Sequence, residues 1–182
     1  MREYIIYIFI LILIIVLIVT AYFLWASGKK EQLLRKKTVS KIEYGSVSVF
    51  FDRRKNVIVI PYAKDKYGVG RAVEEPQFLF SPYKKDELGN FIRKTLAMCN
   101  SENFCSDVKL MKILNSKNWR GFSKGKKSIS VYFKKNTGLV FNKTRRWSDG
   151  SYDFNSNKSN KVLSCYADNN EIGQTLISLL DR

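Results

Sequence analysis

The sequence predicts an α+β fold, in which helices pack on an antiparallel β-sheet made of two similar strand-hairpin-helix units, preceded by one N-terminal transmembrane helix. Three observations support this prediction. A long apolar stretch opens the chain, segments that alternate polar and apolar residues follow it, and two amphipathic helical segments recur in the same order. The chain therefore divides into an N-terminal anchor (residues 1–28), a basic juxtamembrane linker (29–43) and a soluble domain (44–182).

The N-terminal apolar stretch is long enough to span a membrane. The 22 residues from Tyr4 to Trp25 include no charged residue, no Pro and no Gly. At about 1.5 Å per residue they extend about 33 Å, against a bilayer core of about 30 Å, and aromatic residues at the span ends suit the interface. A cleaved signal peptide is the alternative, since small residues follow at 26–28, but its apolar core is usually only about 7–15 residues.

The charges around this stretch predict its orientation. Arg2 is offset by Glu3, whereas five basic residues follow the span: Lys29, Lys30, Arg35, Lys36 and Lys37. The positive-inside rule then predicts a single-pass protein of the inner (cytoplasmic) membrane with its C-terminal domain in the cytoplasm. The three cysteines, Cys99, Cys105 and Cys165, lack metal-site spacing and agree with a reducing compartment.

The first unit covers about residues 46–99. SVSVFF (46–51) alternates as a half-buried strand does, VIVIPY (57–62) follows after a turn, and a third short apolar run lies in FLFSPYKKDE. The unit ends in the amphipathic segment DELGNFIRKTL, where Asp86 is suited to cap a helix and Glu87 to its first turn.

The second unit, about residues 128–182, repeats this order with SISVYF, LVFNK, VLSCYADNNE and finally NEIGQTLISLL, which begins at Asn170. Ser46 and Ser128 are 82 residues apart, and Gly89 and Gly173 are 84 apart. Agreement in order and spacing favours an internal duplication, although Val-rich strands and Leu-rich helices also resemble one another by chance. Because Gly destabilises a helix by about 0.5–1 kcal/mol relative to Ala, we expect the two glycines to allow close approach of helix and sheet.

A further helix is predicted between the units, at about residues 106–115. Ser106 is a plausible N-cap with Asp107 in the first turn. Val108, Met111 and Leu114 form its apolar stripe, and we expect Met111 to fill the core.

The sequence gives little support to an enzyme. The absence of histidine excludes Ser-His and Cys-His nucleophile pairs and most zinc sites, and GVGRAV (68–73) lacks the third Gly of a dinucleotide-binding loop. The acidic pairs Asp86-Glu87 and Glu74-Glu75 are explained as a helix cap and as loop charge. We therefore predict no catalytic residue, no cofactor and no metal site.

Basic and aromatic residues alternate in NWRGFSKGKKS (118–128) and NKTRRWSDGS (142–151). The candidate partner-binding residues are Trp119, Lys126, Lys127, Arg145, Arg146 and Trp147. For the first segment we favour a structural role, in which Trp119 and Phe122 pack the end of the preceding helix on the sheet. For the second, which we expect to be a loop after a strand, binding and a purely structural role stay equally open.

The segments in this order resemble the CdiI-type immunity proteins of bacterial contact-dependent growth inhibition systems. The resemblance covers about residues 44–180 and rests on Asp86-Glu87-Leu88-Gly89, on Trp119, on the segment from Phe122 to Val131, and on the terminal helix at Glu171-Ile172-Gly173. It implies a protein that binds and neutralises the toxic C-terminal domain of a cognate effector delivered by a neighbouring cell.

The charge of the domain departs from many small immunity proteins, which are acidic. Residues 41–182 include 26 basic and 14 acidic side chains, a net charge of +12. The resemblance would therefore imply either an acidic toxin surface or a binding face whose local charge differs in sign from the net charge. The alternative is a membrane-tethered basic module that binds nucleic acid or anionic lipid. Salt distinguishes the two, because phosphate binding weakens steeply with added salt and a packed apolar interface does not.

Overall fold

The computed structural model describes residues 14–23, 25, 45–134, 137–154 and 160–181. The chain forms two units, residues 1–38 and residues 39–182. In the first, residues 14–23 and Trp25 are helical, and their side chains are exposed. Over the described ranges, no helix is both long enough and apolar enough to cross a membrane. The predicted span end Tyr4 and the linker 29–43 lie outside the described residues.

The second unit is an α+β domain with an antiparallel sheet, as the sequence predicts. Its strands follow the order β3-β2-β1-β5-β6-β7, with β4 also paired to β2 and β8 also paired to β6. The strands are β1 (Gly45–Phe51), β2 (Val57–Lys64), β3 (Gly70–Ala72), β4 (Gln77–Leu79), β5 (Lys127–Lys134), β6 (Gly138–Arg146), β7 (Tyr152–Phe154) and β8 (Asn160–Leu163). The short strands β3 and β7 fall in segments that the sequence pattern leaves as loops.

The two halves of the sheet have the same topology around a local two-fold axis. In each half, the second strand pairs with two short strands and the chain then enters a long helix, α2 (Lys85–Met98) or α5 (Asn169–Leu180). The halves meet where β1 pairs with β5, and Ser48 lies directly opposite its counterpart Ser130. This arrangement corresponds to the two predicted strand-hairpin-helix units.

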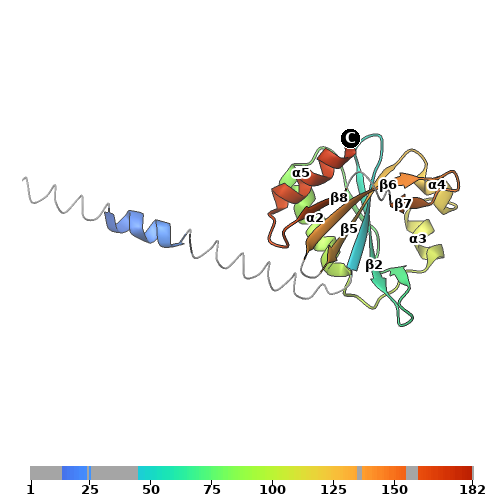
Figure 1. The fold of residues 1–182 in the computed structure, drawn as a ribbon, viewed down its shortest axis with the longest axis horizontal. Coiled ribbons are helices and arrows are strands. Elements are labelled where there is room, and N and C mark those ends of the chain that lie inside the picture. Colours follow the sequence, from blue (N-terminus) through green and yellow to red (C-terminus); the bar gives the residue numbers. More distant parts are fainter. Residues whose placement is uncertain (1–13, 24, 26–44, 135–136, 155–159, 182) are drawn as a thin grey trace, which may run out of the picture. The chain divides into compact units, whose positions relative to one another are not determined.

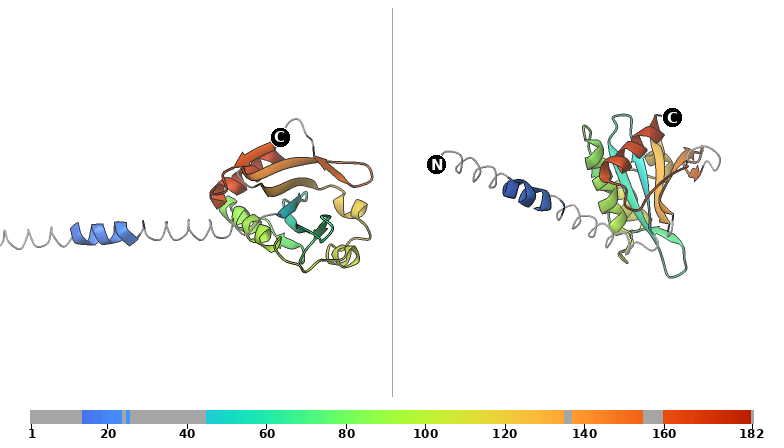
Figure 2. Two further views of the ribbon diagram at one scale, coloured as in Figure 1. Left: turned by 60° about the horizontal axis from the view of Figure 1, so that its bottom comes forward. Right: turned by 60° about the vertical axis from the view of Figure 1, so that its left-hand side comes forward.

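The main core lies between one face of the sheet and the helix pair α2 and α5 (Figures 1 and 2). Alternate residues of the central strands, such as Val47, Val49, Ile129 and Val131, point to this face and are fully buried. They pack against the apolar sides of both helices: Leu88, Ile92, Leu96, Ile172, Leu176 and Leu179. The alternation of the strands and the 3.6-residue period of the helices produce this layer.

The two helix glycines lie at a helix–helix contact, so the predicted approach to the sheet is wrong. A Cβ at Gly89 would overlap the backbone carbonyl of Asn169, and a Cβ at Gly173 would overlap that of Lys85. Asn169 and Lys85 are themselves equivalent first residues of α5 and α2. The contact is therefore reciprocal, as at the interface of a symmetric dimer.

The predicted caps Asp86 and Asn170 are also wrong by two positions. Helix α5 is capped by Asp168, which accepts a hydrogen bond from the N–H of Glu171, while the Glu171 carboxylate accepts from the N–H of Asp168. In α2 the equivalent position is Lys84, whose N–H donates to the Glu87 carboxylate at 3.4 Å. Asp86 lies in the first turn, where its charge still favours the helix N-terminus.

Two short helices cover part of the opposite face of the sheet, on the far side from α2 and α5 (Figures 1 and 2). They are α3 (Asp107–Ile113) and α4 (Trp119–Ser123), and their second core includes Phe50, Ile60, Leu110 and Phe122. Ser106 caps α3 as predicted, but Val108 is 82% exposed and Leu110 is buried instead. Met111 and Leu114 do pack against this core, so the apolar stripe is rotated relative to the predicted one.

Candidate partner-binding site

The segment Arg145-Arg146-Trp147 lies at the end of a hairpin, and the prediction of a loop is wrong for its two arginines. Arg145 and Arg146 belong to β6 and pair with Asp153 and Tyr152 of β7. Only Trp147 begins the turn, which closes with a hydrogen bond from its N–H to the Ser151 carbonyl. The same ladder extends to Phe154, which pairs with Thr144.

Arg146 is engaged by the protein itself. Its guanidinium donates to Ser123 Oγ at 2.9 Å and to the carbonyls of Arg120 and Trp147, both at 3.1 Å. The bonds to Ser123 and Arg120 tie α4 to the β6–β7 hairpin. Arg146 is therefore a structural residue in this arrangement.

Arg145 and Trp147, by contrast, form an exposed pair. The Arg145 guanidinium carbon lies 5.2 Å from the centroid of the Trp147 ring, and the Trp147 side chain is 47% exposed. Such a cation–π pair offers a partner a flat apolar face and hydrogen-bond donors together. It presents the two residue types most frequent at binding hot spots.

Trp119 packs against the second core, in agreement with the structural role that we favoured for it, and Lys126 lies over the ring of Phe122. The Trp119 ring lies 5.7 Å from that of Phe50 in an edge-to-face contact, and Phe122 is buried beside it. Lys126 Nζ lies 4.5 Å from the Phe122 ring centroid and donates to the Phe122 carbonyl. Burial lowers the pKa of this ammonium.

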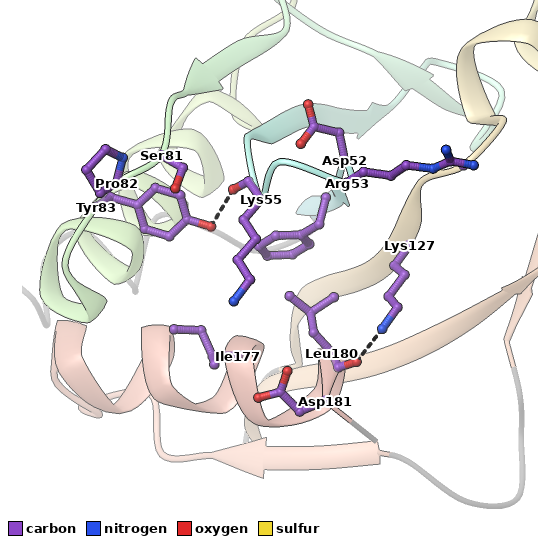
Figure 3. A pocket seen from close by; sticks show the side chains of 12 residues that line it. Asp52, Arg53, Lys55, Ser81, Pro82, Tyr83, Lys127, Ile177, Leu180 and Asp181 are labelled. Carbon is purple, nitrogen blue, oxygen red and sulfur yellow. Dashed lines mark hydrogen bonds between the residues drawn. The ribbon is translucent and has the colours of Figure 1, made fainter.

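Lys127 borders a cavity of about 430 Å³ that the sequence does not reveal (Figure 3). The apolar walls come from Phe51, Tyr83, Ile177 and Leu180. Ile177 and Leu180 project from α5. The Tyr83 hydroxyl donates a hydrogen bond of 2.7 Å to the carbonyl of Lys55, which lies in the turn between β1 and β2. Lys127 Nζ donates to the carbonyl of Leu180 at 2.8 Å.

Charged groups surround this apolar cavity at its rim. The Asp52 carboxylate is taken up by the β1–β2 turn, where it accepts hydrogen bonds from the backbone N–H of Arg54 and from Asn56. Arg53, Lys55 and Asp181 also line the rim. Burial, with a smaller effect of the Asp52 charge, raises the pKa of the Tyr83 hydroxyl, so this phenol is neutral at physiological pH.

Sequence reasoning missed the cavity because its lining comes from separate segments. Residues 51–55, 81–83, 125–127 and 177–181 are far apart in the sequence and lie together only in the folded domain. Among the partner-binding candidates predicted from the sequence, Lys127 alone lines this cavity. Trp119 borders a second hollow. The remaining candidates line neither of the two: Lys126, Arg145, Arg146 and Trp147.

That second hollow, of about 700 Å³, lies between the β2–β3 hairpin and α3. Tyr62 and Leu110 line it, and burial raises the pKa of Tyr62 to about 12. Arg71 at its edge is paired with Asp65 at 2.8 Å. In the part of the chain that the structure describes, no three His, Cys, Asp or Glu side chains gather as a metal site would require.

Comparison with known proteins identifies the fold. No protein-family model matches the chain, and no curated protein matches it. A protein of unknown function from Neisseria meningitidis superposes with a TM-score of 0.58 at 20% identity, over 77% of this chain and 96% of that one. A chain of the CdiA-CT/CdiI toxin and immunity complex from Yersinia pseudotuberculosis superposes with a TM-score of 0.56 at 15% identity, over 75% of this chain and 95% of that one. The domain thus has the fold of a chain found in a toxin and immunity complex.

Proposed function

We propose that this protein is an immunity protein, which binds the toxic C-terminal domain of a cognate contact-dependent growth inhibition effector and masks its surface. The observation that carries the proposal is the fold likeness to a chain of a CdiA-CT/CdiI complex, which extends over 95% of that chain. It agrees with the motif resemblance between residues 44 and 180, although the fold alone does not transfer a function.

The side chains support masking over turnover. The chain contains no histidine, and the exposed pair of Arg145 with Trp147 is suited to contact another protein. An inhibitor of this type acts in a one-to-one ratio with its toxin. The apolar stretch at residues 4–25 would anchor the inhibitor at the inner membrane, with the domain in the cytoplasm where a delivered toxin arrives.

A contact-dependent competition assay tests the proposal. The gene is deleted in its native strain, and the deletion strain is grown on a solid surface with wild-type siblings. We expect wild-type cells to inhibit the deletion strain, and a plasmid copy of the gene to restore its growth. Equal growth of deletion strain and wild type, under conditions in which the neighbouring effector is produced, would contradict the proposal.

The same assay tests the exposed hairpin pair. We expect the double variant Arg145→Ala with Trp147→Ala to fail to protect, although both side chains lie outside the two cores. Its thermal midpoint should stay within a few degrees of the wild-type value. Full protection by a stable double variant would show that the toxin contacts another surface.

A further inference from the structure

The internal two-fold symmetry of the domain provides a comparison for its cavity. Gly89 and Gly173 occupy equivalent places in α2 and α5, so Arg93 of α2 is the counterpart of Ile177 of α5. In the same register, Ala167 before α5 is the counterpart of Tyr83 before α2. The region around Ile177 and Tyr83 is the cavity of about 430 Å³.

The equivalent region in the other half is occupied by an arginine. The Arg93 guanidinium donates to the Ala167 carbonyl and, at 3.0 Å, to Asn169 Oδ1, and so bridges α2 to the segment that precedes α5. Ile177 is shorter and apolar, and it makes no such bridge. An arginine thus bridges the two segments in one half of the domain, and an isoleucine that borders a cavity stands at the equivalent position in the other half.

The cavity is bordered by charged side chains as well as by apolar walls. The rim of the cavity includes the exposed side chains of Arg53 and Lys55, and among the described residues neither charged side-chain group has a hydrogen-bonding or ion-pair partner. The Asp52 carboxylate accepts hydrogen bonds within the β1–β2 turn, so in the described part of the chain Asp181 is the only rim carboxylate that accepts no hydrogen bond. The third rim cation, Lys127, already donates to the Leu180 carbonyl. An apolar floor below two available cations is complementary to an apolar group that lies next to a carboxylate.

We infer that the Ile177 cavity is the docking site for an apolar side chain of the toxin domain that has a neighbouring Asp or Glu. This inference rests on the proposed function and names the chemistry of the partner at one site. The apolar side chain enters between Tyr83, Ile177 and Leu180, and the carboxylate pairs with Arg53 and Lys55. It also explains how a domain of net positive charge recognises its partner, since the partner segment is acidic.

The first test variant is Ile177→Arg, which introduces the residue found at the equivalent helix position, Arg93. A second test variant, Arg53→Gln with Lys55→Asn, removes the two cations and leaves the apolar walls intact. Asn suits the positive φ of 64° at Lys55, so this change adds no backbone strain. The matched control, Lys66→Gln with Lys117→Gln, lowers the net charge by the same amount at two exposed positions away from the cavity.

The first measurement is direct binding, by methyl NMR on the full-length protein in detergent micelles. The probes are three capped tetrapeptides: Asp-Phe-Leu-Glu, Lys-Phe-Leu-Lys and Asp-Ser-Ser-Glu. We expect the first to shift the Ile177 and Leu180 methyl signals saturably and to bind at least about tenfold more tightly than the other two. Ile177→Arg and the Arg53/Lys55 variant should lose this preference, and the Lys66/Lys117 control should keep it. Equal binding of all three peptides, or no shift at either methyl group, would overturn the inference.

The second measurement is the competition assay in the deletion strain. If the wild-type protein protects, we expect Ile177→Arg and the Arg53/Lys55 variant to lose protection, each with an unchanged thermal midpoint. Full protection by both variants would overturn the inference. If wild-type protein does not protect, the proposed function fails, and the peptide experiment alone decides whether the cavity selects an acidic and apolar segment.

Discussion

Two neighbouring arginines of the β6–β7 hairpin have different roles that the sequence alone does not separate. Arg146 donates three hydrogen bonds, two of which join α4 to the hairpin, whereas Arg145 lies over the exposed Trp147 ring. The strand explains the difference, because consecutive residues of a strand point to opposite faces of the sheet. One face is covered by α4 at this point and the other is open.

This difference predicts a difference in stability. We expect Arg146→Ala to lower the free energy of unfolding by about 1–3 kcal/mol, because Ser123 Oγ and two carbonyls lose their donor. Arg145→Ala should change it by less than about 0.5 kcal/mol, as at most exposed positions. Urea unfolding of the two single variants measures both values, and equal destabilisation by the two would contradict the assigned roles.

At the scale of the helices, the reciprocal contact of α2 and α5 depends on two glycines, Gly89 and Gly173. We expect Gly89→Ala to destabilise the domain by about 1–3 kcal/mol, because its Cβ would overlap the Asn169 carbonyl and force the helices apart. Gly70→Ala is the control, since a Cβ there meets no atom within 4 Å. A thermal midpoint for Gly89→Ala at or above that of Gly70→Ala would show that the helices separate without loss.

The cap of α5 gives a second prediction for an element. Asp168→Ala removes the acceptor for the Glu171 N–H and should lower the free energy of unfolding by about 0.5–2 kcal/mol. Asn170→Ala, at the cap that the sequence suggested, should have little effect because Asn170 lies inside the helix and is exposed. Thermal unfolding of the two variants decides between the two positions.

The elements also show what the sequence could predict. The central strands and the helices α2 and α5 are predictable because each has a regular apolar period and packs on one core. The strands β3 and β7 are not predictable, because three residues are too few to show a period. The buried side of α3 is not predictable either, because it depends on how the helix packs against the sheet. The cavity is not predictable either, because it depends on the contrast between Arg93 and Ile177, which matters only once the helices are paired.

For the whole molecule, the open question that bears most on function is the compartment of the domain. The charges that flank residues 4–25 predict that the C-terminus lies in the cytoplasm. A fluorescent protein that matures only in the cytoplasm, fused after Arg182, should therefore fluoresce in cells and sediment with the membranes. A dark fusion, together with activity of a periplasmic enzyme fused at the same site, would reverse the orientation.

The central claim is that the domain binds a toxin domain through a packed protein interface, and titration calorimetry at two salt concentrations tests it most directly. The full-length protein is titrated with the C-terminal domain of an effector whose toxicity it is proposed to neutralise. The account predicts a one-to-one complex with a dissociation constant on the order of nanomolar, which changes by less than about tenfold between about 50 and 200 mM salt. No complex with the toxin domain, with binding instead to duplex DNA or anionic vesicles that weakens by about a thousandfold or more over the same salt range, would contradict it.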